Sequence, residues 1–140
     1  MLRRSNKSWP KDIADMHKKF GVYTRATEMT ERELALWLQL RISMQEEELN
    51  ELKEAHFKRD AEGVVDALID TLVFAVGTLD ILGVDANKAW DVVMAANMSK
   101  TTGVKPGRPN PLRLPDLIKP ADWVEPTHSD NIGITEKFLK

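Results

Sequence analysis

Two groups of carboxylates stand out because they lie on neighbouring predicted helices. The first group, in the run QEEELNEL, consists of Glu46, Glu47, Glu48 and Glu51. The second group, in the run VVDALIDTLVF, consists of Asp66 and Asp70. Side chains at positions i and i+4 of a helix share a face, and residues 64–82 are apolar almost all round, which is typical of a buried helix. Two acids on one face of such a helix would lose hydration and repel each other.

A buried acidic pair of this kind needs protonation, a basic partner or a metal ion. The apolar run contains no Lys or Arg, and a second acidic helix cannot neutralise the pair. The two groups can together complete an all-oxygen site for Mg²⁺ or Mn²⁺, which are hard cations. Two structural interpretations stay open beside this one. A Glu-rich stretch is usually a solvated helix face, and a buried Asp pair can be held by Arg or by backbone donors.

Composition limits the class of protein. The chain of 140 residues fits one domain, and its net charge of −2 argues against an electrostatic nucleic-acid binder. The absence of cysteine excludes disulfides, thiolate zinc sites and a cysteine nucleophile. Residues 64–82 nearly reach the length of a membrane span, but three Asp interrupt them, and each centrally placed Asp costs about 2.5–3.5 kcal/mol. With no signal-peptide pattern at the start, we expect a soluble, cytoplasmic protein that binds neither nucleic acid nor membrane.

Hydrophobic spacing and capping residues predict four helices. They cover residues 10–20, 30–57, 62–82 and 86–99, with 22–29 as a connector and 58–61 as a turn. Thr30 and Glu33 match a capping box at the start of the second helix, and Gly83 is a stop after the third. The residues expected to face inward on the fourth helix are Trp90, Val93 and Met94.

The composition changes after residue 100. Six of the seven prolines lie in residues 106–126, which predicts an extended tail rather than a helix. We therefore expect an all-α domain over residues 1–100 and a Pro-rich tail over 101–140. One chain this short supplies few apolar neighbours for the third helix, so we expect a homodimer or homotetramer that completes a helical bundle.

Several cations follow the fourth predicted helix. The run NMSK contains Asn97 and Lys100, and Lys105 and Arg108 come soon after. A Lys at a helix end is favoured by the helix dipole alone. A metal site for a phosphate ester, however, also needs cations on the remaining phosphate oxygens, so these four residues are candidates for substrate binding.

At these positions the chain resembles the MazG-like superfamily of all-α nucleoside triphosphate pyrophosphohydrolases. The run EELNE resembles the EExxE motif of that superfamily, whose members include phosphoribosyl-ATP pyrophosphohydrolase and the dimeric dUTPases. DMHKKFGV, DALIDTLVFAVGTLDILGVD and NMSK resemble its phage-type branch. The resemblance covers residues from about 10 to about 100.

The resemblance implies metal ligands residue by residue. The acids that match the family's motifs are Glu47, Glu48, Glu51 and Asp70. The Glu that the family has three residues before Asp70 is Ala67 here. Asp66, one residue further back, is therefore a candidate for a direct ligand, a water-mediated ligand or a base. Asn97 and Lys100 match residues that the family uses on phosphates or sugar.

The activity implied by the resemblance is hydrolysis of a nucleoside or deoxynucleoside triphosphate to the monophosphate and pyrophosphate. Glu47 and Glu48 are the catalytic candidates, with Glu47 as a proton acceptor from a metal-activated water. The phage-type branch contains MazZ-like enzymes that act on dGTP, which makes dGTP or GTP a candidate substrate. Ile13, His17 and Phe74 are candidates for base selectivity, although the default for His17 on a short helix is a surface position. The alternative is a non-catalytic helical adaptor, which would need no metal.

Overall fold

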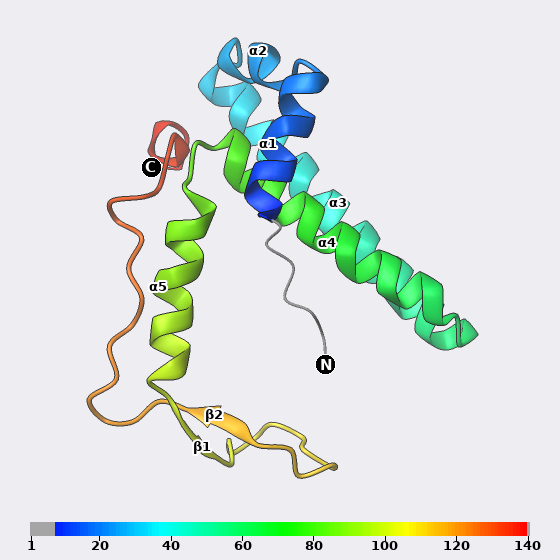
Figure 1. Ribbon diagram of the computed structural model, residues 1–140, viewed down its shortest axis with the longest axis vertical. Coiled ribbons are helices and arrows are strands. Elements are labelled where there is room, and N and C mark those ends of the chain that lie inside the picture. The colour runs from blue at the N-terminus through cyan, green and yellow to red at the C-terminus, as the bar shows by residue number, and fades with distance from the viewer. Residues whose placement is uncertain (1–7, 140) are drawn as a thin grey trace. The chain divides into compact units, whose positions relative to one another are not determined.

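The computed structural model describes residues 8–139 and is mainly helical (Figure 1). The helices are α1 (Trp9–Lys19), α2 (Val22–Thr27), α3 (Glu31–Lys58), α4 (Ala61–Ile81) and α5 (Ala86–Met98). Two short strands, β1 (Thr101–Gly103) and β2 (Asp116–Ile118), and the 3₁₀ helix η1 (Thr135–Lys137) follow. The predicted all-α class is confirmed. The described residues form two compact units, 8–86 with 132–139, and 87–131.

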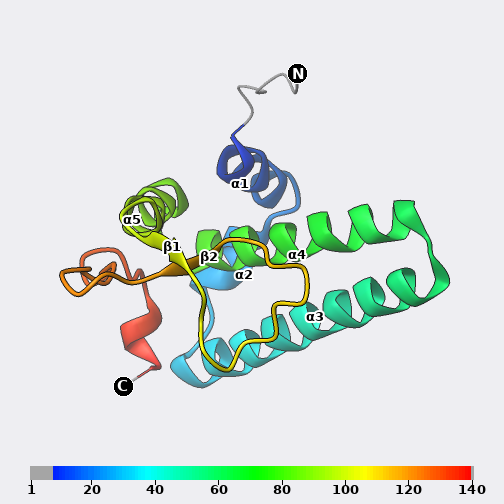
Figure 2. The ribbon, with the colours of Figure 1, turned by 90° about the horizontal axis from the view of Figure 1, so that it is seen from below.

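Helices α3 and α4 form an antiparallel hairpin in the first unit (Figure 2). The predicted capping box is present, because Glu33 N donates to Thr30 Oγ1 at 3.2 Å and Thr30 N donates to Glu33 Oε2 at 2.8 Å. Arg59 follows α3 with a left-handed φ of 58°, and Asp60 then caps α4 by accepting from Gly63 N at 3.0 Å. Because the turn is this short, the acidic segments of the two helices lie side by side.

Helix α1 packs against α4 and is followed by α2. Residues 22–29 were predicted to be a connector, and that prediction is wrong because residues 22–27 form α2. Gly21 begins the short helix with a φ of 67°, a conformation that Gly adopts without strain. The Tyr23 hydroxyl donates to Asp80 Oδ2 on α4 at 2.6 Å. This contact between distant parts of the sequence holds α2 in place.

The buried apolar side chains of the described residues are few and small. They are Ile13, Leu34, Ala55, Ala67 and Leu82. In α4 only Ala67 and Gly77 are buried, while Val65 is 62% and Leu68 49% exposed. The incomplete cover of α4 agrees with the expectation that one chain supplies few apolar neighbours for this helix, because α1 and α3 cover only part of its surface. The oligomer that would cover the rest stays a prediction.

The second unit, residues 87–131, contains most of α5 and the β1–β2 pair. The strands are antiparallel, with Thr101 opposite Ile118. Trp123 Nε1 donates to Ala96 O at 2.8 Å, which joins the chain after β2 to α5. Trp90 is 63% exposed and Val93 is exposed, so the prediction that both face inward is wrong for the single chain.

No single helix among residues 8–139 is long and apolar enough to cross a membrane. Helices α4 and α5 together pass that test, by length and composition only.

Candidate functional site

The acidic site on the α3–α4 hairpin is centred on Glu48. Its side chain is buried, with only 8% of the residue exposed. Its Oε2 atom is also buried and has no hydrogen-bond partner among the described residues. A buried carboxylate oxygen normally accepts at least one hydrogen bond. Glu48 therefore has an unmet need for a donor or a cation.

The neighbours of Glu48 increase this need. Burial is the largest cause that raises the pKa of the Glu48 carboxyl, and repulsion from other carboxylates adds to it. In order of effect, those carboxylates belong to Glu51, Asp70, Asp66 and Glu47. The α3–α4 hairpin thus brings four of the other five acids singled out in the sequence within electrostatic range of Glu48; Glu46 is the exception.

The distribution of burial among these acids differs from the expectation. The sequence predicted that the Asp pair would be the buried one, but Asp66 is exposed and Asp70 is only partly buried. The single chain leaves much of α4 uncovered, whereas Glu48 lies on the face of α3 that meets α4. Glu48 is consequently the acid for which desolvation matters most.

The donor set fits a hard divalent cation. All five side chains offer carboxylate oxygens and no nitrogen or sulfur, which suits Mg²⁺ or Mn²⁺. A cation would provide the unpartnered Glu48 oxygen with a partner and would offset the repulsion from Glu51 and Asp70. Across residues 8–139, no three His, Asp or Glu side chains are already grouped at the spacing of a metal site.

Two of the three predicted base-selectivity residues, His17 on α1 and Phe74 on α4, lie in polar clusters. His17 is buried, and its Nδ1 lies 2.6 Å from Asp80 Oδ2. The surface position expected for His17 is therefore wrong, because α1 turns this side chain onto α4. Asp80 also accepts from Tyr23, whose ring meets the His17 ring edge-on at 5.7 Å. Burial, followed by the hydrogen bond to Asp80, raises the pKa of Tyr23 to about 12.

The second polar cluster surrounds Arg41, which the sequence interpretation missed. The Arg41 guanidinium lies over the ring of Phe74 at 5.0 Å and over that of Trp37 at 5.9 Å. Its Nε donates to Thr78 Oγ1 at 2.9 Å. Arg41, Met44, Glu48 and Glu51 follow one another on α3 at intervals of three, four and three residues, which places them on one face of the helix. That spacing was the signal that could have identified Arg41.

The candidates for phosphate binding lie in the second unit. Lys100 Nζ donates to Asn97 Oδ1 at 2.9 Å, so the structure brings these two residues together. Arg108 forms an ion pair with Asp116, at 3.0 Å between Nη1 and Oδ1. Each of these contacts is internal to residues 87–131.

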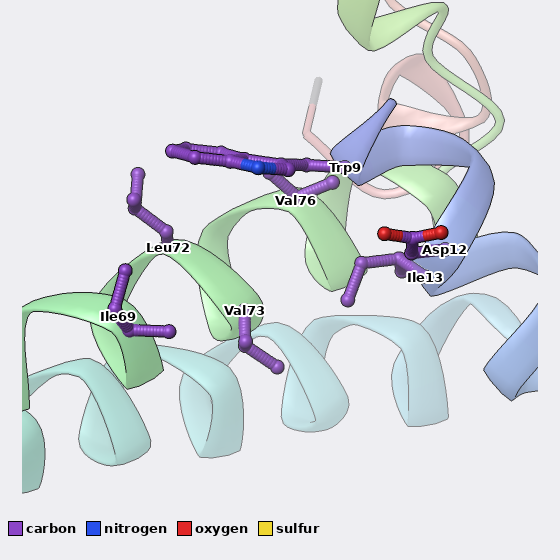
Figure 3. A pocket seen from close by; sticks show the side chains of 7 residues that line it. All are labelled: Trp9, Asp12, Ile13, Ile69, Leu72, Val73 and Val76. Carbon is purple, nitrogen blue, oxygen red and sulfur yellow. The ribbon is translucent and has the colours of Figure 1, made fainter. Parts of the chain in front are cut away.

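An apolar pocket of about 190 Å³ lies between α1 and α4. Figure 3 shows its lining side chains, which are Trp9, Asp12, Ile13, Ile69, Leu72, Val73 and Val76. Of the predicted site residues, only Ile13 lines this pocket. The pocket is therefore separate from the acidic cluster.

Comparison with known proteins gives one match. A family model described as phosphoribosyl-ATP pyrophosphohydrolase matches residues 13–97. The match spans more than half of the chain and includes α3 and α4 in full. No curated protein and no solved structure matches the chain.

Proposed function

This chain belongs to the phosphoribosyl-ATP pyrophosphohydrolase family, and we propose that within this family it cleaves dGTP or GTP to the monophosphate and pyrophosphate. The family lies in the MazG-like superfamily and hydrolyses a phosphoanhydride bond of a nucleoside triphosphate. The runs DMHKKFGV and NMSK support a place in the phage-type branch. One water is consumed, and the bond between the α and β phosphates breaks.

The observation that carries this proposal is the unpartnered Oε2 of Glu48 amid four other carboxylates. A solvated helix face would expose its acids and pair them with Lys. Such a pair exists on the same helix, where Lys58 and Glu54 interact at the surface. Glu48 has the opposite character, because it is buried and the charged groups that shift its pKa are all acids. That arrangement is costly for a purely structural helix and suits a cation site.

Members of the family generally depend on a divalent metal, and we propose Mg²⁺ or Mn²⁺ here. Glu48, Glu51 and Asp70 would hold the cation, with Asp66 as a direct or water-mediated ligand. When bound, the cation screens the charge of the triphosphate and lowers the pKa of a coordinated water. Glu47 accepts the proton of the attacking water. Asn97 and Lys100 bind phosphate or sugar oxygens, with Lys105 and Arg108 as further phosphate contacts.

The experiment is a substrate panel with separate detection of monophosphate and pyrophosphate. It should contain all NTPs and dNTPs, together with phosphoribosyl-ATP, the substrate in the family's description, each with Mg²⁺, Mn²⁺ or chelator. We expect pyrophosphate release that requires the metal and is fastest with dGTP or GTP. Release of orthophosphate alone, or equal turnover with chelator, would contradict the mechanism. Fastest turnover of another nucleotide would contradict only the choice of base.

A further inference from the structure

Arg41 carries a positive charge that no carboxylate balances within residues 8–139. Both oxygens that accept from it, Thr78 Oγ1 and the Phe74 carbonyl, are neutral. Its third contact is a weak one from Nη1 to Met44 Sδ at 3.9 Å. Arg stays charged in proteins, and a partly buried charge is normally paired. An unpaired, partly buried guanidinium is therefore suited to a ligand that presents acceptor atoms.

The guanidinium is also held in a fixed orientation. The rings of Trp37 and Phe74 flank it, and the bonds to Thr78 and Phe74 anchor the Nε and Nη2 atoms. The absence of a side chain at Gly77 leaves room for the guanidinium, because a Cβ at position 77 would lie 3.0 Å from Arg41 Nη2. Of the five N–H donors of a guanidinium, two are used on oxygen atoms. The spare donors are mostly on Nη1, and they are arranged as a planar fork.

The position of Arg41 relative to the acidic cluster defines what part of a ligand it can reach. Arg41 and Glu48 are seven residues apart on α3, which corresponds to about 10.5 Å along the helix. On α4, Phe74 and Thr78 follow Asp70 by one and two turns. Phosphates bound at the acidic cluster would thus leave the far edge of an extended nucleotide, its base, in the vicinity of Arg41.

We propose that Arg41 is a specificity-determining residue that donates two hydrogen bonds to the O6 and N7 atoms of a guanine base. Guanine offers two acceptors side by side on that edge, and a bidentate Arg is their commonest partner in nucleic-acid recognition. Adenine has an amino group in place of O6. This hydrogen-bond donor would face the donors of Arg41 and could not accept from them. The inference rests on the proposed function and deepens it, because it explains how guanine would be chosen.

The decisive substrate pair is dGTP and 7-deaza-dGTP, which differ only in the N7 acceptor. The wild-type kcat/KM should favour dGTP by about 10-fold or more, within the discrimination of a good bidentate pair. Arg41→Lys keeps the charge and removes the planar fork, so the preference should fall toward 1. Arg32→Lys, at an exposed position of α3, is the matched control and should retain the wild-type preference.

Three outcomes would overturn the inference. An equal fall in kcat/KM for all nucleotides in Arg41→Lys would mean that Arg41 binds phosphate or supports the fold. If Arg41→Lys kept the wild-type preference for dGTP over 7-deaza-dGTP, another residue would have to recognise the base. Turnover of dITP, which keeps O6 and N7 but lacks the 2-amino group, should depend on Arg41 as turnover of dGTP does, and a kcat/KM for dITP that Arg41→Lys leaves unchanged would also contradict this geometry.

Failure of the proposed function is separable from failure of this inference. If the wild type hydrolyses none of the nucleotides, calorimetry with dGMP and 7-deaza-dGMP replaces the kinetic assay. A preference for dGMP that disappears in Arg41→Lys would support guanine recognition without catalysis. Absence of that preference in the wild type would overturn the inference as well.

Discussion

Glu48→Gln is the substitution that examines the acidic site most directly. It preserves the size of the side chain and removes the charge that burial and four carboxylates disfavour. The Gln amide can also donate a hydrogen bond to a neighbouring carboxylate, which Glu48 cannot do when ionised. We therefore expect the metal-free variant to melt at the same temperature as the wild type or higher, even though a buried residue has changed.

The expected effect on metal binding follows from linkage. A metal at 100 times its dissociation constant stabilises the native state by about 2.7 kcal/mol, which is roughly a 10 °C rise in melting temperature for a domain of this size. Mutation of groups that only support a metal ligand weakens binding about 10–100-fold, so loss of a ligand should weaken it about 100-fold or more. The same metal concentration then equals the dissociation constant, the stabilisation falls to about 0.4 kcal/mol, and the melting rise shrinks to about 1–2 °C.

The assay is differential scanning fluorimetry with and without Mn²⁺, alongside pyrophosphate release from the same preparations. Glu46→Gln is the control, because Glu46 is an exposed acid of the same run and is absent from the carboxylates that raise the pKa of Glu48. That control should keep the full metal-induced rise. A Glu48→Gln variant that retains both the rise and the activity would refute the assignment of Glu48 as a ligand. A variant destabilised without metal would show that Glu48 has a structural role.

Three further predictions follow from particular contacts. Asp70→Asn should lose metal binding and turnover together while remaining folded; a variant that melts lower yet still releases pyrophosphate would identify Asp70 as a structural acid. Tyr23→Phe removes a hydrogen bond to a carboxylate and should lower the free energy of unfolding by about 1–2 kcal/mol at pH 7 in urea titrations. The pKa of Tyr23 is raised from 10.0 to about 12, so the stabilisation by the neutral phenol is complete below pH 10 and is lost as the pH rises through 12. The difference in free energy of unfolding between Tyr23→Phe and wild type should therefore narrow over that interval rather than stay constant. Sedimentation velocity at micromolar concentration should show at least a dimer that covers α4, and a stable folded monomer would disprove this oligomer.

The elements that the sequence predicted best are those defined by local chemistry. Thr30 begins α3 through a capping box, and Gly83 follows the end of α4 as expected, because caps depend on residues within one turn. Helix α2 could not be found in this way. Its anchoring hydrogen bond joins Tyr23 to Asp80, which are 57 positions apart. No local pattern records such a contact.

The proximity of the acids in the candidate site was also predictable from local sequence. Acids on two helices joined by a short turn must lie near one another, and the structure places them so. Which acid would be buried depended on what covers each helix. The apolar run of α4 was expected to be buried in an oligomer, and the single chain leaves much of it uncovered while it buries Glu48 of α3. The position of His17 also depended on packing between helices. A surface position was the default for it, but α1 packs on α4 and buries its side chain.

The α3–α4 hairpin carries two charges of opposite sign that do not neutralise each other. Arg41 and Glu48 share a helix face, yet about 10.5 Å of helix separates them, which is too far for an ion pair. A shift of the acid to position 44 or 45 would place it one turn from Arg41, where such pairs stabilise a helix, but Met44 and Gln45 occupy those positions. Folding alone gives no reason for leaving both charges unpaired at a desolvated face. A nucleotide that brings a metal ion to one end and base acceptors to the other would satisfy both, and for this reason we propose the acidic cluster and Arg41 as two ends of one binding site.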